Sequence, residues 1–375
     1  MKTQEPRFRI VKRDTFKPGQ QVLAYVGAVV FALFVGALLL MSLDVDPLEF
    51  YTRILTMGIP GNKFPGRIVE NFIKLYVPLL ITSLALALAF KMRFWNIGGE
   101  GQFIMGAICA GVAALKLGES LPQPLMVLVM ALCGFLGGGL YGLFVAALKV
   151  RFNTNETLLT LMLNYVALYL LRFFGETAGE WNFFLDPASP RPKFVKFPAS
   201  AQMITFDLGG FRLNLSLIIA ILLCVLFFVY LRYTKQGYEI SVVGDSPNTA
   251  RYAGMKVNKI VLRTIFLSAA LIGMAAAFHV SSAGILSTSV TNNVGWTGIV
   301  VAWLAKLNTL GIVVTSLLIT VLRFGCQNAS TTYAAIDGNF ADLLQGIILF
   351  SVLAADFFTR FKLVRGGKSR KEGAK

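Results

Sequence analysis

Long apolar runs separated by short polar segments organise this chain. Most runs approach the length of about 20 residues that an α-helix needs to cross a bilayer. They are predicted at residues 22–43, 73–90, 102–115, 125–148, 157–174, 215–231, 264–280, 311–323 and 343–358. A tenth run, which opens at Gly295, has only about ten apolar residues, a length typical of a half-helix. The pattern predicts an all-α polytopic membrane protein with eight to ten transmembrane or half-spanning helices.

A glycine-rich polar segment, Phe94–Gln102, lies between the second and third runs. Its three glycines do not favour a helix, and the side chains of Asn96, Glu100 and Gln102 are costly in hydrocarbon. Such a segment is tolerated where backbone and side chains line a cavity or a water-facing pocket. An ordinary interfacial turn between two helices is the alternative. We expect a functional site here, because a turn needs Gly and Asn but not an acid beside an amide.

Composition excludes a soluble protein. Of the 375 residues, 56% are hydrophobic and 14% are charged, and the mean hydropathy is +0.68. A soluble domain of this size could not bury that much apolar surface. The formal net charge of +16 does not call for a nucleic-acid partner, because basic residues beside apolar runs follow the orientation rule of membrane helices. The four cysteines lack CxxC spacing, which predicts core residues and no metal site.

Basic residues divide unevenly between the two sets of connecting segments. With the N-terminus in the cytoplasm, 24 of the 35 Lys and Arg residues fall on inner segments and 11 on outer ones, Lys74 and Arg323 among the outer set. Because Lys and Arg concentrate on the cytoplasmic side, the bias predicts that both termini are cytoplasmic.

The same assignment predicts the domain organisation. A basic cytoplasmic leader, residues 1–21, precedes a transmembrane domain, residues 22–359, and a basic cytoplasmic tail, residues 360–375. The longest extracytoplasmic loop is residues 175–214, and the longest cytoplasmic loop is residues 232–263. The outer loop is long enough for a docking surface, although a plain connector is the simpler interpretation.

The cytoplasmic loop contains the signals of a short helix. Ser246 is a favourable N-cap, Pro247 suits the first helical position, and Gly254 suits the residue just past the end. Two turns of exposed helix are therefore predicted.

A few isolated residues remain. Asn164 is a lone amide in the run 157–174, for which Asn155 or Thr154 is the predicted N-cap. Trp296, at the start of the short run, could stack on a ring-shaped substrate or anchor a span end. The sequence has no P-loop and no dinucleotide-binding signature, so we expect no nucleotide hydrolysis by this chain alone.

Several motifs stand in a characteristic order. They are Asn96-Ile97-Gly98-Gly99-Glu100-Gly101-Gln102, Asn155-Glu156 followed by Leu161-Met162-Leu163-Asn164-Tyr165, Gly237-Tyr238-Glu239-Ile240 leading to Ala250-Arg251-Tyr252-Ala253-Gly254, and Gly295-Trp296-Thr297-Gly298-Ile299. In this order they resemble bacterial ABC importer permeases of the family that serves branched-chain amino acids, simple sugars and nucleosides. The nucleoside branch is the most similar. The resemblance covers the chain from the second run to about Asn328.

The resemblance implies a permease subunit in the bacterial cytoplasmic membrane that moves a small molecule. It implies a cytoplasmic ABC ATPase, a second permease chain, and an extracytoplasmic substrate-binding protein or lipoprotein as partners, with ATP used by the ATPase and no cofactor in this chain. The residues that we predict to form the pathway, because a nucleoside needs hydrogen-bonding groups and aromatic faces, are Trp95, Asn96, Glu100, Gln102, Asn164 and Trp296. For Glu100 a structural role is the alternative, in which it ties the spans together by accepting hydrogen bonds from backbone amides freed by the glycines. The residues implied to couple to the ATPase are Asp245, Ser246, Pro247, Ala250, Arg251, Ala253 and Gly254.

Other functions stay open on the residues alone. Within the class, the substrate could be a nucleoside, riboflavin, a simple sugar or a branched-chain amino acid. A secondary transporter would need its own coupling acids, and only Glu100 and Glu156 are candidates. A membrane-embedded enzyme would need a catalytic constellation, and none has usable spacing.

Overall fold

The computed structural model of the protein describes residues 8–12, 18–57, 59–60, 64–207, 212–333, 336 and 339–365. Most of the basic leader and tail lies outside these ranges. The described part has thirteen α-helices, and nine of them are long and apolar enough to cross a membrane. These nine are α1 (Pro18–Ser42), α3 (Pro65–Lys91), α4 (Gly99–Leu117), α5 (Gln123–Phe152), α6 (Glu156–Glu176), α7 (Leu215–Tyr233), α10 (Val257–Ala283), α12 (Thr309–Ser330) and α13 (Phe340–Arg360). With the short helix α11 (Val294–Leu304), they confirm the predicted fold class.

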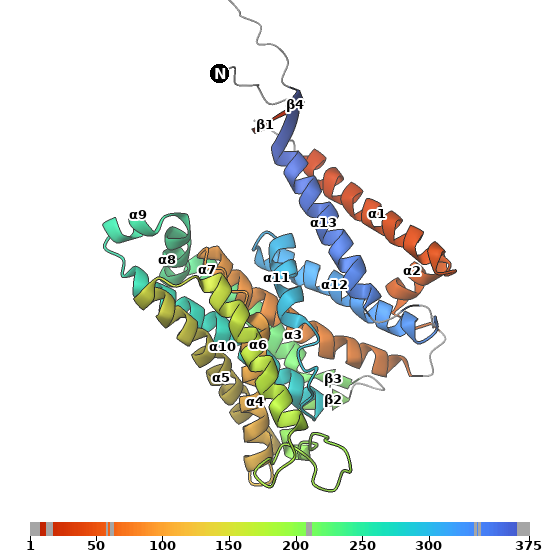
Figure 1. The fold of residues 1–375 in the computed structure, drawn as a ribbon, viewed down its shortest axis with the longest axis vertical. Helices are drawn as coiled ribbons and strands as arrows, with labels where there is room; N and C mark the ends of the chain where they lie inside the picture. The colour runs from red at the N-terminus through yellow and green to blue at the C-terminus, as the bar shows by residue number, and fades with distance from the viewer. Residues whose placement is uncertain are drawn as a thin grey trace, which may run out of the picture. The chain divides into compact units, whose positions relative to one another are not determined.

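The chain forms two compact units, residues 56–324 and residues 1–55 with 325–375. In the unit that contains the termini, α1 and α13 lie side by side (Figure 1). At one end of this helix pair, strand β1 (Phe8–Lys12) pairs antiparallel with β4 (Phe361–Arg365). The apolar pattern did not predict this pairing.

Helix α2 (Pro47–Thr56) lies between the first two predicted runs, where no helix was predicted. The Asp46 carboxylate accepts a hydrogen bond from the Leu48 amide at 2.8 Å, which caps the helix ahead of Pro47. Phe50 and Ile54 are buried, and this apolar face fixes α2 within its unit. The helix is too short to appear as an apolar run. The pair Asp46-Pro47 was the signal in the sequence that could have predicted its start.

The larger unit is a helix bundle with α3 at its centre. Most of the α3 side chains between Phe72 and Phe90 are buried. Helices α4, α5 and α10 meet closely at Gly273, where a Cβ atom would lie 2.9 Å from the backbone of Gly138. Small residues thus let these backbones touch.

The two ends of this bundle carry different elements (Figure 1). Helices α8 (Lys235–Asp245) and α9 (Pro247–Tyr252) lie at one end. The connection between α6 and α7 lies at the other, with a short 3-10 turn η1 (Ala199–Ala201) and the hairpin of β2 (Thr205–Asp207) and β3 (Arg212–Asn214).

Five basic residues assigned to outer segments lie within the bounds of spanning helices instead, and Lys74 and Arg323 lie farthest from a helix end. Lys74 is in the third turn of α3 and forms an ion pair with Glu70 at 2.8 Å. Arg323 is in α12, where its guanidinium donates a hydrogen bond to the Thr297 hydroxyl at 3.1 Å. The hydropathy pattern ends a predicted span at a charged residue. Here each charged side chain has a partner within the bundle, so the helix continues through it.

Candidate functional site

The polar segment Phe94–Gln102 is partly helical, which corrects the expectation that its glycines oppose a helix. Helix α4 begins at Gly99, and the Gln102 amide bonds to the Gly98 carbonyl at 3.0 Å. Asn96 and Gln102 exchange two side-chain amide hydrogen bonds, at 3.1 and 3.0 Å, and both are buried. Each amide therefore satisfies the other, as a buried polar group requires.

Helix α6 holds the same segment from the side. The Asn164 side chain accepts a hydrogen bond from the Gly101 amide at 2.8 Å and donates one to the Ile97 carbonyl at 2.9 Å. The Thr160 hydroxyl accepts a bond from the Ile97 amide at 3.2 Å. Asn155 caps α6 through bonds from Thr157 and Leu158, which confirms one of the two predicted caps. The lone amide of the fifth span thus serves the polar segment.

Glu100 joins α4 to the first turn of α11. Its buried carboxylate oxygen Oε1 accepts hydrogen bonds from the amides of Gly295 at 3.0 Å and Trp296 at 3.2 Å. Asn293, the N-cap of α11, makes no side-chain cap bond, so the carboxylate from α4 takes that role. A negative charge at a helix N-terminus is favourable, and the free amides there need acceptors.

The approach of α4 to α11 depends on glycine. A Cβ atom on Gly295 would lie 2.7 Å from the backbone of Gly99, so no other residue fits without moving one helix. Beside this crossing, the Arg323 guanidinium of α12 donates a hydrogen bond to the Thr297 hydroxyl of α11. The N-terminus of the short helix is therefore fixed by the Glu100 carboxylate and a close backbone contact.

Aromatic rings gather at the other end of α11. Trp95 stacks on Trp303, with ring centroids 5.3 Å apart and planes 18° apart, and Phe90 tilts against both. The two stacked rings remain substantially exposed, Trp95 at 47% and Trp303 at 41%. Trp296 is also 41% exposed. Among the predicted pathway residues, the four polar side chains are thus engaged internally, and the two tryptophans are partly exposed.

The short helix of the cytoplasmic loop forms as predicted. The Ser246 hydroxyl accepts a bond from the Thr249 amide at 3.2 Å, Pro247 starts α9, and Gly254 adopts a left-handed conformation with φ of 75°. One expectation was wrong, because Ala250 is fully buried within this chain rather than exposed. The outward face is formed instead by Arg251, Ala253 and Tyr252, the last 93% exposed.

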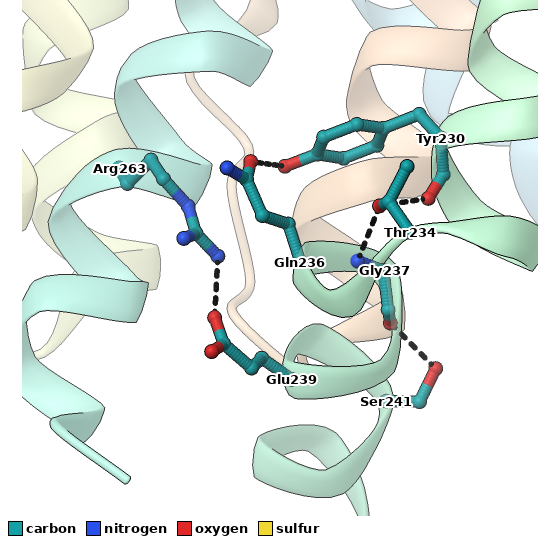
Figure 2. A network of polar contacts seen from close by, with 7 residues as sticks. All are labelled: Tyr230, Thr234, Gln236, Gly237, Glu239, Ser241 and Arg263. Atoms are coloured by element: carbon teal, nitrogen blue, oxygen red, sulfur yellow. Dashed lines mark hydrogen bonds and ion pairs between the residues drawn. The ribbon is translucent and has the colours of Figure 1, made fainter.

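A polar network secures α8, the helix before α9 (Figure 2). The Thr234 hydroxyl accepts a bond from the Gly237 amide at 3.1 Å and donates one to the Tyr230 carbonyl at 2.6 Å, which fixes the corner between α7 and α8. The Arg263 guanidinium of α10 bonds to the Glu239 carboxylate at 3.0 Å. Helix α8 is thus connected to two spans.

Helix α8 also contacts the end of α3. A Cβ atom on Gly244 would collide with the carbonyl oxygen of Lys91 and lie 3.2 Å from Met92. Met92 is two residues before the polar segment, and Asp245, which ends α8, is next to the N-cap of α9. A backbone route of direct contacts therefore leads from α9 through α8 to the polar segment.

Sequence reasoning missed α8, the Glu239–Arg263 ion pair and Trp303. The Thr234 cap three residues before Gly237 was a readable signal for α8. The ion pair joins residues 24 apart in sequence, so only the packing of α8 on α10 brings them together. Trp303 looked like an ordinary residue of an apolar run.

The nine long apolar helices and the half-length helix of the described residues are those of a multi-pass membrane protein. The chain belongs to the family of branched-chain amino acid transport system permease components, which matches residues 68–353. It is thus a permease of an ABC importer, a class that works with an ATPase and a substrate-binding protein on a small-molecule substrate.

Named relatives cover most of the chain. The nucleoside ABC transporter permease NupB of Lactococcus lactis is 26% identical over 82% of this chain and 84% of its own length. The guanosine ABC transporter permease NupP of Bacillus subtilis is 28% identical over 92% of this chain and 96% of its own length. The glucose ABC transporter permease TsgB13 of Haloferax volcanii is 26% identical over 91% of this chain and 90% of its own length. No solved structure matches this chain significantly.

Proposed function

We propose that this chain forms the membrane pathway of a nucleoside importer. The observation that carries the proposal is its similarity, along nearly the full length of both chains, to permeases named for nucleosides and guanosine. The partly exposed aromatic rings beside α11 supply flat surfaces on which the base of a nucleoside can stack. A simple sugar is the second candidate, because a glucose permease is similar over a comparable length.

The proposed assembly contains a second, non-identical permease chain, a cytoplasmic ABC ATPase and an extracytoplasmic binding protein or lipoprotein, in the bacterial cytoplasmic membrane. This chain would be no enzyme and would hold no cofactor, because ATP binds to the partner. The position of α9 and of the α6–α7 connection at opposite ends of one bundle supports an ATPase at one face and a binding protein at the other.

Helix α9 is the proposed contact with the ATPase. Its outward residues Arg251, Tyr252 and Ala253 would meet the partner, while Asp245, Ser246, Pro247, Ala250 and Gly254 shape and support the helix. When the ATPase moves α9, the contact of Gly244 with Lys91 would pass the displacement to the polar segment. The Glu239–Arg263 ion pair would keep α8 from rotating independently of α10.

The polar segment would then control α11. Asn96, Gln102 and Asn164 keep the segment rigid, and Glu100 ties it to the N-terminus of α11. A displacement of Lys91 and Met92 would therefore move Trp95 and the short helix with Trp296. Opening of the pathway would follow from ATP use by the partner, without an ion gradient.

Uptake into proteoliposomes that contain the complete complex tests the substrate class. Radiolabelled guanosine should accumulate when ATP is enclosed, and excess adenosine or uridine should compete while glucose and leucine should not. Competition by glucose with none by nucleosides would support the sugar alternative and refute the proposal.

A further inference from the structure

The exposed face of α11 cannot face lipid. The helix has 11 residues, so it is about 16 Å long, roughly half of a bilayer's hydrocarbon thickness. The backbone leaves the helical conformation on both sides, with left-handed residues at Asn292 and Asn293 before it and at Lys306 and Leu307 after it. Irregular backbone at membrane depth occurs only where protein or water covers it.

Packing places α11 at that depth. A Cβ atom on Gly298 would lie 3.2 Å from side-chain atoms of Thr82 and Leu86. Leu86 is more than one helical turn, and Thr82 more than two, inside the end of α3 at Lys91. The exposed face of α11 therefore borders a water-filled path or another protein chain.

The rings on this face form a platform. Trp296 and Trp303 are seven residues apart, which puts them on the same side of the helix, whereas Gly298, Val301 and Ala302 are buried on the other. Trp303 is backed by its parallel stack with Trp95, which holds its plane in place. Two partly exposed indoles on one side of the helix suit a planar ring, because stacking of a base on an aromatic side chain is worth about 1–3 kcal/mol.

We propose that Trp303, stacked on Trp95, is a binding surface for the base of the transported nucleoside. The inference rests on the proposed function and assigns a substrate contact to a residue that the motifs do not contain. A purine covers more of an indole than a pyrimidine does, so the platform favours purine nucleosides. The position of Trp95 in the polar segment connects the platform to the route from α9.

The chain contains a matched control. Trp181, in the α6–α7 connection, stacks on Phe173 at 5.4 Å with 19° between planes, and it is also about half exposed. The variants Trp303→Phe, Trp303→Leu and Trp181→Leu would be compared in proteoliposomes with the complete complex, by ATP-dependent uptake of adenosine and uridine. Co-purification with the ATPase verifies assembly of each variant.

Trp303→Leu should lower adenosine uptake about tenfold and uridine uptake less, whereas Trp303→Phe keeps most of both. Trp181→Leu should leave the ratio of the two substrates unchanged. In the wild-type complex, photolabelling with 8-azidoadenosine should modify peptides that contain Trp303 or Trp95, and this measurement holds even if a variant fails to assemble.

Two results overturn the platform. One is an adenosine-to-uridine ratio in Trp303→Leu equal to that of the wild type, and the other is photolabel confined to other peptides. Neither affects the assignment of nucleosides as substrates. A wild-type complex that takes up no nucleoside refutes the proposed substrate class, and the platform with it.

Discussion

Removal of the Glu100 carboxylate tests how α11 is held. Glu100→Ala leaves the buried amide of Gly295 and the partly buried amide of Trp296 without their acceptor. An unsatisfied buried donor costs about 1–3 kcal/mol and a partly buried one costs less, so the two together should lower the free energy of unfolding by about 2–4 kcal/mol. Glu100→Gln keeps an acceptor oxygen and loses only the charge. Because a hydrogen bond to a charged group is worth about 1 kcal/mol more than a neutral one, the loss should be about 2 kcal/mol.

The assay is thermal unfolding of the purified complex in detergent, with uptake measured in parallel. Glu49→Gln is the matched control, because it removes the same charge from an exposed ion pair with Arg53 within one helix, which is worth about 0–1 kcal/mol. Stability should fall in the order Glu49→Gln, Glu100→Gln, Glu100→Ala, with the substrate preference of residual transport unchanged. If Glu100→Gln were as stable as the wild type and had lost transport, Glu100 would act in the pathway and the reasoning would be refuted.

Three further outcomes are expected. Gly273→Ala should destabilise the bundle by about 1–3 kcal/mol, because the new methyl group would meet only backbone atoms. Gly346→Ala in α13 is the control, because its methyl group would enter open space. Equal melting temperatures of the two variants would contradict the packing. Ala253→Asp should abolish co-purification with the ATPase without loss of membrane insertion, and retained association would exclude α9 as the contact. Glu239→Gln should leave ATP hydrolysis but reduce uptake per ATP, with recovery in the charge-swapped Glu239→Arg, Arg263→Glu double variant, and an unchanged ratio would remove the ion pair from the coupling route.

Most of the fold could be predicted from the sequence, because each membrane helix appears as a long apolar run. The spans, the half-length of α11 and the caps Asn155 and Ser246 were all readable locally. Helix α2 and the β1–β4 pairing were not, since a ten-residue helix and a two-stranded ladder leave no signal in hydropathy. Lys74 was misassigned because its partner, Glu70, is one turn away on the same helix.

The candidate site was readable in its residue types but not in its connections. A glycine-rich segment with an acid and two amides is costly in a membrane, and this cost is why the sequence predicts a site there. That Glu100 caps α11 could not be foreseen, because the two lie 195 residues apart and meet only through packing. The burial of Ala250 and the stack of Trp303 on Trp95 likewise depend on tertiary contacts.

The most direct test of the account is the dependence of transport on partners. Proteoliposomes that contain this chain alone should take up no guanosine, under an imposed proton or sodium gradient or with ATP. Adding the ATPase, the companion permease and the binding protein should give uptake that requires ATP and stops when any one of the three is omitted. Gradient-driven uptake by the isolated chain would contradict the assignment.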